Sequence, residues 1–228
     1  MQQAYRVLRI VAEAETIRIV LNPDPDSLML SELRIACAGL HTESSAGIKA
    51  VVLDFSDAVH RASDGEAAHQ ASPISEIEEA VAAVRAVVQP VIAVVQATPS
   101  ATACTLIGAA DLTLIADDAI LLIPGTDSNE NTLPGVQAAR LGYVTWSAPA
   151  NNINKELERI LDLLREKSAI ALRLTKASVR LGQTDHSTHL EALKQINNFY
   201  LTAVMKTADA SEGLRAFLEK RKPNWKNM

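Results

Sequence analysis

The hydrophobic positions of this chain form two patterns, short unbroken apolar runs and apolar positions spaced at a helical period. Unbroken runs are typical of strands covered on both faces of a sheet, whereas spaced positions place one apolar stripe on a helix. The runs predict strands at 5–10, 17–21, 50–55, 91–95 and 112–115. The spaced positions predict helices at 27–41, 74–88, 101–108, 153–167, 169–181 and 188–205. Strands that alternate with helices indicate the α/β class.

Polar and turn-forming residues mark where some of these elements begin. The sequence NPDPD at 22–26 predicts a loop before the first helix, which Ser27 or Ser31 would cap. Asn151 or Asn152 would cap the helix that begins near residue 153. Each cap would place a side-chain oxygen against the first free N–H groups of its helix.

The stretch 90–119 organises the middle of the chain. It predicts a buried strand, a polar turn, a short helix of small residues and a second buried strand. Ser100 is an acceptable N-cap for that helix, and the first free backbone N–H groups belong to Ala101, Thr102 and Ala103. Such groups attract an anion or a developing oxyanion.

Composition narrows the class of protein. The chain has 228 residues, of which 48% are hydrophobic and 21% charged, as expected of a globular protein with one large domain or a core and an appendage. A net charge of −5 argues against a broad nucleic-acid surface. Cys37 and Cys104 form no CxxC or Cys/His cluster, so free thiols are expected rather than a disulfide or a metal site. No apolar run approaches a membrane-spanning length and no signal-peptide core is visible, so we expect a cytoplasmic protein with no membrane partner.

Two segments of the chain carry a resemblance to a known family. They are similar to the signature and C-terminal motifs of the crotonase (enoyl-CoA hydratase/isomerase) superfamily, in a divergent and shortened form. The matching residues are Pro90-Val91-Ile92-Ala93, Cys104, Ala110-Asp111-Leu112, Ser211-Glu212-Gly213, Ala216-Phe217 and Glu219-Lys220-Arg221-Lys222-Pro223. The resemblance implies the ClpP/crotonase fold, a ββα spiral core over 1–148 followed by a helical trimerisation region over 149–228. It also implies a homo-oligomer, either a trimer or a dimer of trimers.

The resemblance further implies a CoA thioester as ligand, with no other cofactor and no metal. Its oxyanion donors would be the N–H groups of Ala62 and Thr102, and its CoA-binding positions would be Phe217 and Lys220. The loop at 22–26 carries acidic residues where the family has a basic one, and Coulomb's law predicts that a polyphosphate is disfavoured there. A helical stretch of the family is missing near 124–134, where turn residues predict a bridging loop.

The two catalytic glutamates that the resemblance implies are both replaced. Thr105 stands at the first position and Gly125 at the second, and neither side chain transfers protons as a carboxylate does. At the oxyanion turn, Thr102 replaces the central glycine and would be strained by about 1 kcal/mol or more if the backbone there needs φ > 0.

Three interpretations follow from these replacements. The empty acid positions favour a catalytically silent protein, a pseudoenzyme that binds an acyl-CoA or serves as partner subunit of an active paralogue. The alternative is an atypical crotonase-fold enzyme with relocated acid and base residues. The candidates for those residues are His60, Asp64, Asp127 and Glu130. The third is acyl transfer with Ser100, Thr102 or Cys104 as nucleophile, for which no Gly-x-Ser-x-Gly elbow is present.

Overall fold

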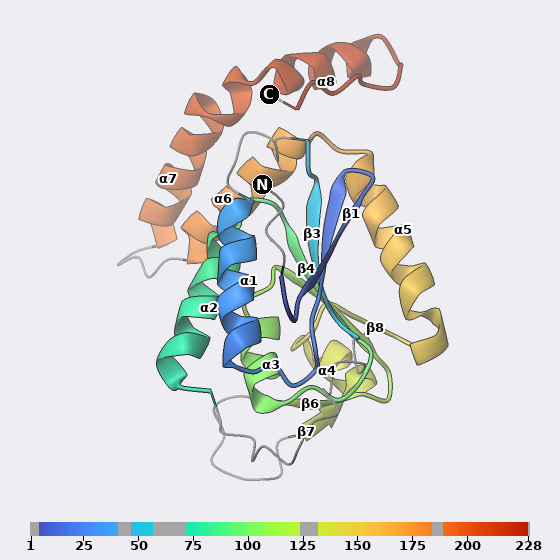
Figure 1. Ribbon diagram of the computed structural model, residues 1–228. Helices are drawn as coiled ribbons and strands as arrows, with labels where there is room; N and C mark the ends of the chain where they lie inside the picture. The colour runs from blue at the N-terminus through green and yellow to red at the C-terminus, as the bar shows by residue number, and fades with distance from the viewer. Residues whose placement is uncertain (1–4, 41–46, 57–71, 124–131, 184–188, 228) are drawn as a thin grey trace, which may run out of the picture.

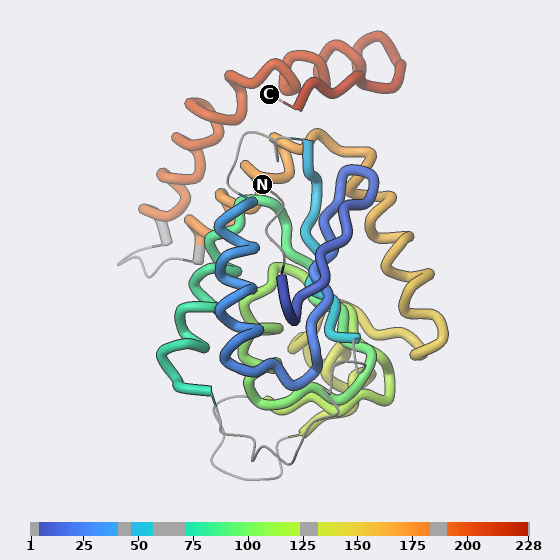
Figure 2. The backbone as a smooth tube through the Cα atoms, viewed as in Figure 1, coloured from blue at the N-terminus to red at the C-terminus, as the bar shows by residue number. Residues whose placement is uncertain are grey.

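A computed structural model describes residues 5–40, 47–56, 72–123, 132–183 and 189–227 (Figures 1 and 2). Its centre is a six-stranded sheet in the order β1-β2-β3-β4-β5-β8, beside a small sheet of β6 and β7. The central strands are β1 (Arg9–Glu13), β2 (Thr16–Val20), β3 (Ala50–Phe55), β4 (Val91–Val95), β5 (Leu112–Ala116) and β8 (Trp146–Ala148). The small sheet pairs β6 (Ile120–Leu122) with β7 (Thr132–Pro134).

The central sheet is parallel except at one edge. β1 and β2 form an antiparallel hairpin, whose turn holds Glu15 at φ 59°, and every later pairing in this sheet is parallel. All residues of β3 and β4 are buried, which is why the sequence shows them as unbroken apolar runs. Both strands have the bounds that the sequence predicts. The α/β class is therefore confirmed, while the hairpin strands are shifted along the chain from their predicted positions.

Helices connect the parallel strands and cover both faces of the sheet. α1 (Ser27–Gly39) and α2 (Ile74–Ala86) pack against each other on one face, and α5 (Ile153–Arg165) lies across the other (Figure 1). The short α3 (Ala101–Ile107) joins β4 to β5, and α4 (Gly135–Leu141) precedes β8. The core between these layers includes fully buried side chains of Ile19, Leu33, Leu53, Ile92 and Leu157. None of the described helices is long and apolar enough to cross a bilayer.

The helix caps only partly follow the sequence prediction. Asp26, not Ser27 or Ser31, caps α1, since its carboxylate accepts the Met29 N–H at 2.8 Å while Ser27 is already the first helical residue. Ser100 caps α3 as predicted. Asn152 stands at the N-cap position of α5 but its side chain makes no capping bond, because a 3₁₀ turn at Ala150–Asn152 leads into that helix.

The predicted loop at 124–134 ends in a strand, β7, and the chain then packs closely against β5. Gly135 opens α4 beside Ala116, and a Cβ on Gly135 would lie 2.1 Å from the Ala116 carbonyl oxygen. Gly142 ends α4 in the left-handed region at φ 81°, with the Tyr143 N–H donating to the Ala138 carbonyl at 2.9 Å. Both glycines therefore meet a geometric requirement that a side chain would disturb.

The C-terminal region holds one helix more than the sequence predicts. It comprises α6 (Ala169–Gln183), α7 (His189–Thr202), a 3₁₀ turn (Val204–Lys206) and α8 (Ala208–Leu218), which extend away from the sheet (Figure 2). The last residues fold back onto this region. The Trp225 indole N–H donates to the Glu166 carbonyl at 2.8 Å, and the buried Asp209 carboxylate accepts the N–H groups of Lys226 and Asn227 at 2.7 and 2.9 Å.

Candidate functional site

The loops that follow β2 and β4 meet at the carboxyl end of the sheet. The Ser100 N–H donates to the Pro23 carbonyl at 2.9 Å, which ties the two loops together. A cavity of about 550 Å³ lies between them. Its lining residues are Asn22, Pro23, Asp24, Ala97, Thr98, Pro99 and Ser100. Ligands of open α/β sheets bind at this end of parallel strands, so the cavity is where the sheet topology places a binding site.

At the start of α3, two backbone donors have no acceptor within the described part of the chain. The Ser100 hydroxyl accepts the Ala103 N–H at 3.3 Å, and the Ser100 carbonyl accepts the Cys104 N–H at 2.9 Å. Among the described residues, no acceptor is bonded to the N–H groups of Ala101 and Thr102. Thr102 is half-buried and has a negative φ, so threonine is unstrained here. The N–H of Thr102 therefore has no acceptor among the described residues, and its backbone is free of the strain that a left-handed conformation would impose.

Thr105 occupies the position of the first family glutamate, and its hydroxyl is already engaged. The Thr105 Oγ1 donates to the Ala101 carbonyl one helical turn earlier, at 3.0 Å, on the exposed side of α3. A threonine hydroxyl bonded back to its own helix offers neither a carboxylate base nor a readily lost proton.

Two of the proposed nucleophiles, Cys104 and Ser100, are poorly suited to attack a thioester. The Cys104 side chain is 6% exposed, and burial raises the pKa of its thiol, although a hydrogen bond from the Leu122 N–H opposes the rise. The thiol therefore stays protonated near neutral pH. The Ser100 hydroxyl serves as the helix cap, and no described carboxylate or imidazole is hydrogen-bonded to it.

The acidic loop at 22–26 is structured by its own polar groups. The Asn22 side chain accepts the Asp24 N–H at 2.9 Å, and the Met29 sulfur accepts the Asn22 N–H at 3.3 Å. Asp26 is engaged in capping α1, whereas the exposed Asp24 lines the cavity. The negative charge at the cavity mouth is consequently that of Asp24.

The proposed CoA-binding residues of the C-terminus lie far from this cavity within one chain. Phe217 is 78% exposed on α8, and α8 lies at the opposite end of the molecule from α3 (Figure 1). Lys220 follows α8 in the left-handed region at φ 53°, where the Arg221 N–H donates to the Ala216 carbonyl at 3.0 Å. The chain therefore does not bring Phe217 or Lys220 to its own Thr102.

The remaining predicted site residues lie outside the described part of the chain. These are His60, Ala62, Asp64, Gly125, Asp127 and Glu130. Within the described ranges, no group of three or more His, Cys, Asp or Glu side chains could hold a metal ion.

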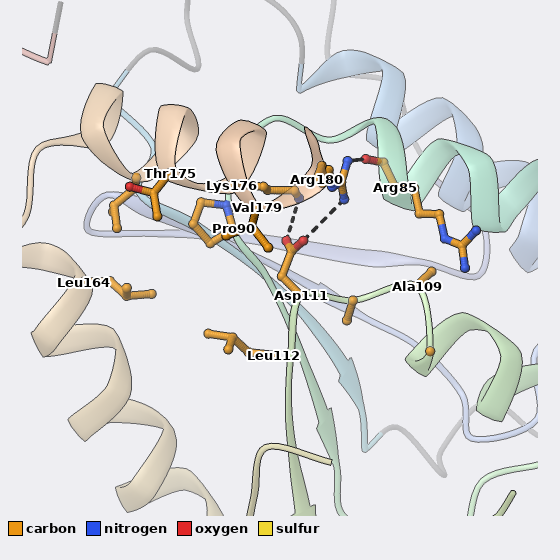
Figure 3. Close-up of a pocket in the computed structure, with 13 residues that line it drawn as sticks. Arg85, Pro90, Ala109, Asp111, Leu112, Leu164, Thr175, Lys176, Val179 and Arg180 are labelled. Atoms are coloured by element: carbon orange, nitrogen blue, oxygen red, sulfur yellow. Dashed lines mark hydrogen bonds and ion pairs between the residues drawn. The ribbon is translucent and has the colours of Figure 1, made fainter. Parts of the chain in front are cut away.

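A second site, which is charged, lies at the amino end of the same sheet. The sequence analysis does not predict it. The α6 cleft, of about 880 Å³, runs between α5, α6 and the first residues of β5 (Figure 3). We define it by Asp111, Leu112, Leu164, Leu172, Lys176 and Arg180. The sequence signal was a lysine and an arginine one helical turn apart on a helix with apolar neighbours, which alone predicts only a solvated face.

Comparison with known proteins finds similarity in the C-terminal part of the chain. Residues 129–228 match the model of the family described as enoyl-CoA hydratase/isomerase. A crotonyl-CoA hydratase from Syntrophomonas wolfei is 30% identical over 89 residues, which cover 39% of this chain and 33% of that protein. The match therefore spans about a third of the relative's length.

Solved structures are similar over nearly the whole chain. An enoyl-CoA hydratase/isomerase from Mycobacterium paratuberculosis superimposes with a TM-score of 0.77 at 18% identity, covering 99% of this chain and 100% of that one. An enoyl-CoA hydratase from Polaromonas sp. JS666 gives a TM-score of 0.77 at 19% identity, with 97% and 100% covered. One from Bacillus anthracis gives 0.73 at 23% identity, with 98% and 100% covered. At these identities the likeness shows the fold.

Proposed function

We propose that the chain is a member of the crotonase superfamily that binds an acyl-CoA thioester without hydrating it. The proposal places the thioester carbonyl against the Thr102 N–H, beside the cavity at the carboxyl end of β2 and β4. It makes the protein a silent enoyl-CoA hydratase/isomerase-like protein that retains a ligand site and lacks the usual proton-transfer groups.

One observation carries the proposal, the contrast between Thr102 and Thr105 on the same helix. The Thr102 N–H has no described acceptor, whereas the Thr105 hydroxyl is bonded to the Ala101 carbonyl at 3.0 Å. A backbone N–H still binds a carbonyl oxygen, because that needs no particular side chain. General acid–base catalysis contributes about 10²–10⁴-fold per positioned group, so replacing both family acids with Thr105 and Gly125 would lower turnover by about 10⁴-fold or more.

Binding can be tested with a pair of proline variants in the first turn of α3. Acyl-CoAs should raise the melting temperature of the full chain more than free CoA does, since a ligand at about 100 times its Kd adds about 2.7 kcal/mol of stability. Thr102→Pro deletes the proposed donor and should abolish that difference. Ala101→Pro deletes the neighbouring N–H and should preserve the difference in melting temperature. Proline is tolerated at this position because the preceding Ser100 is already extended at ψ 170°.

Two results would contradict the binding proposal. One is an equal shift with acyl-CoA and free CoA. The other is an acyl-CoA shift that survives in Thr102→Pro. Thr102→Ala, which keeps the N–H and removes only the side chain, serves as the control for the threonine itself, and denaturation of each variant without ligand verifies that it folds.

The absence of hydratase activity can be tested separately with crotonyl-CoA. We expect no hydration above the uncatalysed rate. Turnover within a few orders of magnitude of ordinary enoyl-CoA hydratases would contradict the proposal of a catalytically silent protein and favour the atypical enzyme. Replacing His60, Asp64, Asp127 and Glu130 one at a time with alanine would then identify the relocated acid or base.

We also propose that copies of the chain associate through the C-terminal helices. The supporting observation is an exposed set of large apolar side chains on and between α7 and α8: Tyr200, Leu201, Met205, Leu214, Phe217 and Leu218. Such patches mark interaction surfaces. Association as a trimer or a dimer of trimers would also place Phe217 and Lys220 beside the thioester site of a neighbouring copy. The two residues cannot reach the thioester site of their own chain.

Light scattering on the full chain tests the association. The wild type should have the mass of a trimer or a hexamer, and Phe217→Glu should reduce that mass. Phe217→Leu, which keeps an apolar side chain, is the matched control. A monomeric wild type would refute self-association and leave an active paralogue as the partner to be sought.

A further inference from the structure

The outer edge of β1 has no neighbouring strand. Among the described strands, β1 stands first in the order of the six-stranded sheet and pairs with β2 alone (Figure 1). No residue of β1 is buried: Arg9, Ile10 and Ala12 are exposed, and Val11 and Glu13 are partly exposed. An exposed strand edge is a template for the addition of a further strand.

The register of the hairpin decides which backbone groups face that edge. Glu13 is paired with Thr16 across a two-residue turn, so these two residues must be hydrogen-bonded to each other, because the alternative pattern would need a bond between the two adjacent turn residues. Bonded and non-bonded pairs alternate along an antiparallel ladder. The N–H and C=O groups of Ile10 and Ala12 therefore face outward, and no described residue is hydrogen-bonded to them there.

The side chains of β1 are complementary to those of the same strand turned end for end. The sequence RIVAE has a cation at its start, an anion at its end and a valine at its centre. An antiparallel pair of β1 strands centred on Val11 would set Arg9 of each copy opposite Glu13 of the other. The same register sets Ile10 opposite Ala12, so that their outward-facing backbone groups bond to one another. Charge and backbone thus specify one register.

Arg9 and Glu13 are suited to form such a pair. Arg9 is exposed, and none of the described residues forms an ion pair with it. The Glu13 carboxylate contacts the Arg18 guanidinium at 3.3 Å, and 31% of the Glu13 side chain is exposed. A carboxylate accepts more than one cationic donor. Arg9 and Glu13 of the two copies would form a non-hydrogen-bonded pair, the kind in which side chains approach most closely, so their opposite charges would attract.

We propose that the β1 edge is an interaction surface for a second copy of this chain, which joins the two central sheets by antiparallel pairing of their β1 strands. A two-fold contact brings the same surface of both copies together and therefore requires a surface that is complementary to itself. Val11 would meet its own counterpart at the two-fold axis. The partner strand would also cover part of Ile10, which is 37% exposed.

The small size of β1 indicates at which stage of assembly the contact acts. A strand of five residues offers less area than the about 800 Å² per partner that a stable interface buries, so one pair of strands would hold two single chains weakly. The next step rests on the proposed association through the C-terminal helices. Two trimers would meet through one strand pair for each chain of a trimer, and linked contacts reinforce one another. The β1 edge therefore favours the dimer of trimers over the trimer.

Light scattering with charge variants of the full chain tests the contact. The wild type should have the mass of a hexamer. Arg9→Glu sets two acidic side chains opposite each other and should reduce the mass to that of a trimer. Arg9→Gln removes the attraction without adding repulsion, so it should raise the hexamer–trimer dissociation constant by less. Arg140→Glu makes the same change of charge on the exposed side of α4 and should leave the hexamer intact.

A mixture of two variants tests the register. Glu13→Lys alone should also be trimeric, because Arg9 of one copy then faces a lysine of the other. When it is mixed in equal amounts with Arg9→Glu, both ends of each strand meet an opposite charge, and hexamers should form again.

A proline tests the backbone part of the contact. Ala12→Pro removes an outward N–H and leaves the hydrogen bonds to β2 in place, which an edge strand tolerates. It should weaken the hexamer, whereas Ala12→Val, which keeps the N–H, should not. Thermal denaturation of each variant verifies that it folds.

The outcomes separate the β1 contact from the association through the C-terminal helices. A trimeric wild type would overturn the β1 contact and leave the C-terminal association intact. A hexamer in Arg9→Glu, or a mixture that stays trimeric, would also overturn the β1 contact. A dimeric wild type that Arg9→Glu separates into monomers would support the β1 contact and refute the C-terminal association. A monomeric wild type would refute both.

Discussion

The two ends of β4 and β5 use their polar residues in opposite ways. At the carboxyl end, Ser100 caps α3 and Thr105 bonds back to the helix carbonyl, so these hydroxyl groups serve the backbone. At the amino end, Asp111, Lys176 and Arg180 form ion pairs that join α6 to the sheet. The end where the sheet topology places a ligand thus has hydroxyl groups bonded to the backbone and the exposed Asp24, while a cluster of ion pairs lies at the other end. The comparison predicts that substitutions in the amino-end cluster cost folding stability and that loss of the Thr105 hydroxyl at the carboxyl end does not.

The largest effect is expected at Asp111, the residue that both cations share. Asp111→Ala leaves the buried Lys176 without its counter-ion and frees the Val91 N–H, which Asp111 accepts at 2.7 Å. Breaking a buried pair from one side typically costs 3–5 kcal/mol, so we expect a loss of about 3–4 kcal/mol in the free energy of unfolding by urea. Asp111→Asn, which keeps an acceptor for the Val91 N–H, should lose less. A loss below about 1 kcal/mol would mean that the cluster does not anchor α6.

The next largest effect is expected at the carboxyl end, from packing rather than from charge. Gly135→Ala would place a Cβ 2.1 Å from the Ala116 carbonyl oxygen, so α4 or β5 must move. Overpacking of this kind costs about 1–3 kcal/mol, and the backbone position of the clash favours the upper part of that range. Thermal unfolding of Gly135→Ala, beside Gly39→Ala where a Cβ meets nothing within 4 Å, gives the measurement and its control. Equal melting temperatures would refute the close approach.

A smaller, pH-dependent effect is expected at Glu32. Its carboxylate belongs to neither end of β4 and β5 and accepts backbone N–H groups. Burial would raise the pKa of Glu32, but the N–H groups of Arg6, Val7 and Leu8 donate to its carboxylate at 2.7 to 3.0 Å and hold the pKa below its usual value. Its stabilising contribution is therefore complete above the unfolded-state pKa of about 4.3 and is lost as pH falls through the lower folded value.

Glu32→Gln tests that contribution. We expect it to cost about 1–2 kcal/mol at pH 7, because the charge-assisted hydrogen bonds weaken. The difference between wild type and variant should shrink as pH falls below about 4. A difference that is constant with pH would show that the ionised form of Glu32 is not the one bonded to the three N–H groups.

The sequence predicted the elements that depend on local pattern. β3 and β4 were found with their bounds because strands buried on both faces must be unbroken apolar runs. Ser100 was found as a cap because its neighbours define where α3 can begin. Asp26 was missed as a cap because Asp26 and the adjacent Ser27 can both accept an N–H, and only the first helical residue decides between them.

The elements that depend on distant contacts were not predictable. Asp111 and Lys176 are far apart in sequence and meet because α6 folds back onto the amino ends of the strands. The apolar pattern does not predict α8, whose position depends on the buried Asp209 and on the folded-back residues that donate to it. In the candidate site, the roles of Thr102 as donor and of Thr105 as an emptied acid position stay predictions from the family resemblance. The bond that engages the Thr105 hydroxyl did not follow from the sequence.

The smallest effect is expected at Thr105, and it tests the carboxyl half of the comparison most directly. Thr105→Ala removes an exposed hydroxyl whose only hydrogen bond among the described residues is to the Ala101 carbonyl. Such back-bonding competes with the helix, and alanine has the higher helix propensity, so we expect a change within about 0.5 kcal/mol, in the stabilising direction. Acyl-CoA binding should be unchanged, because the Thr102 N–H remains. A loss of stability above about 1 kcal/mol would make Thr105 an anchor comparable with the amino-end cluster, and a loss of acyl-CoA binding would make its hydroxyl part of the ligand site.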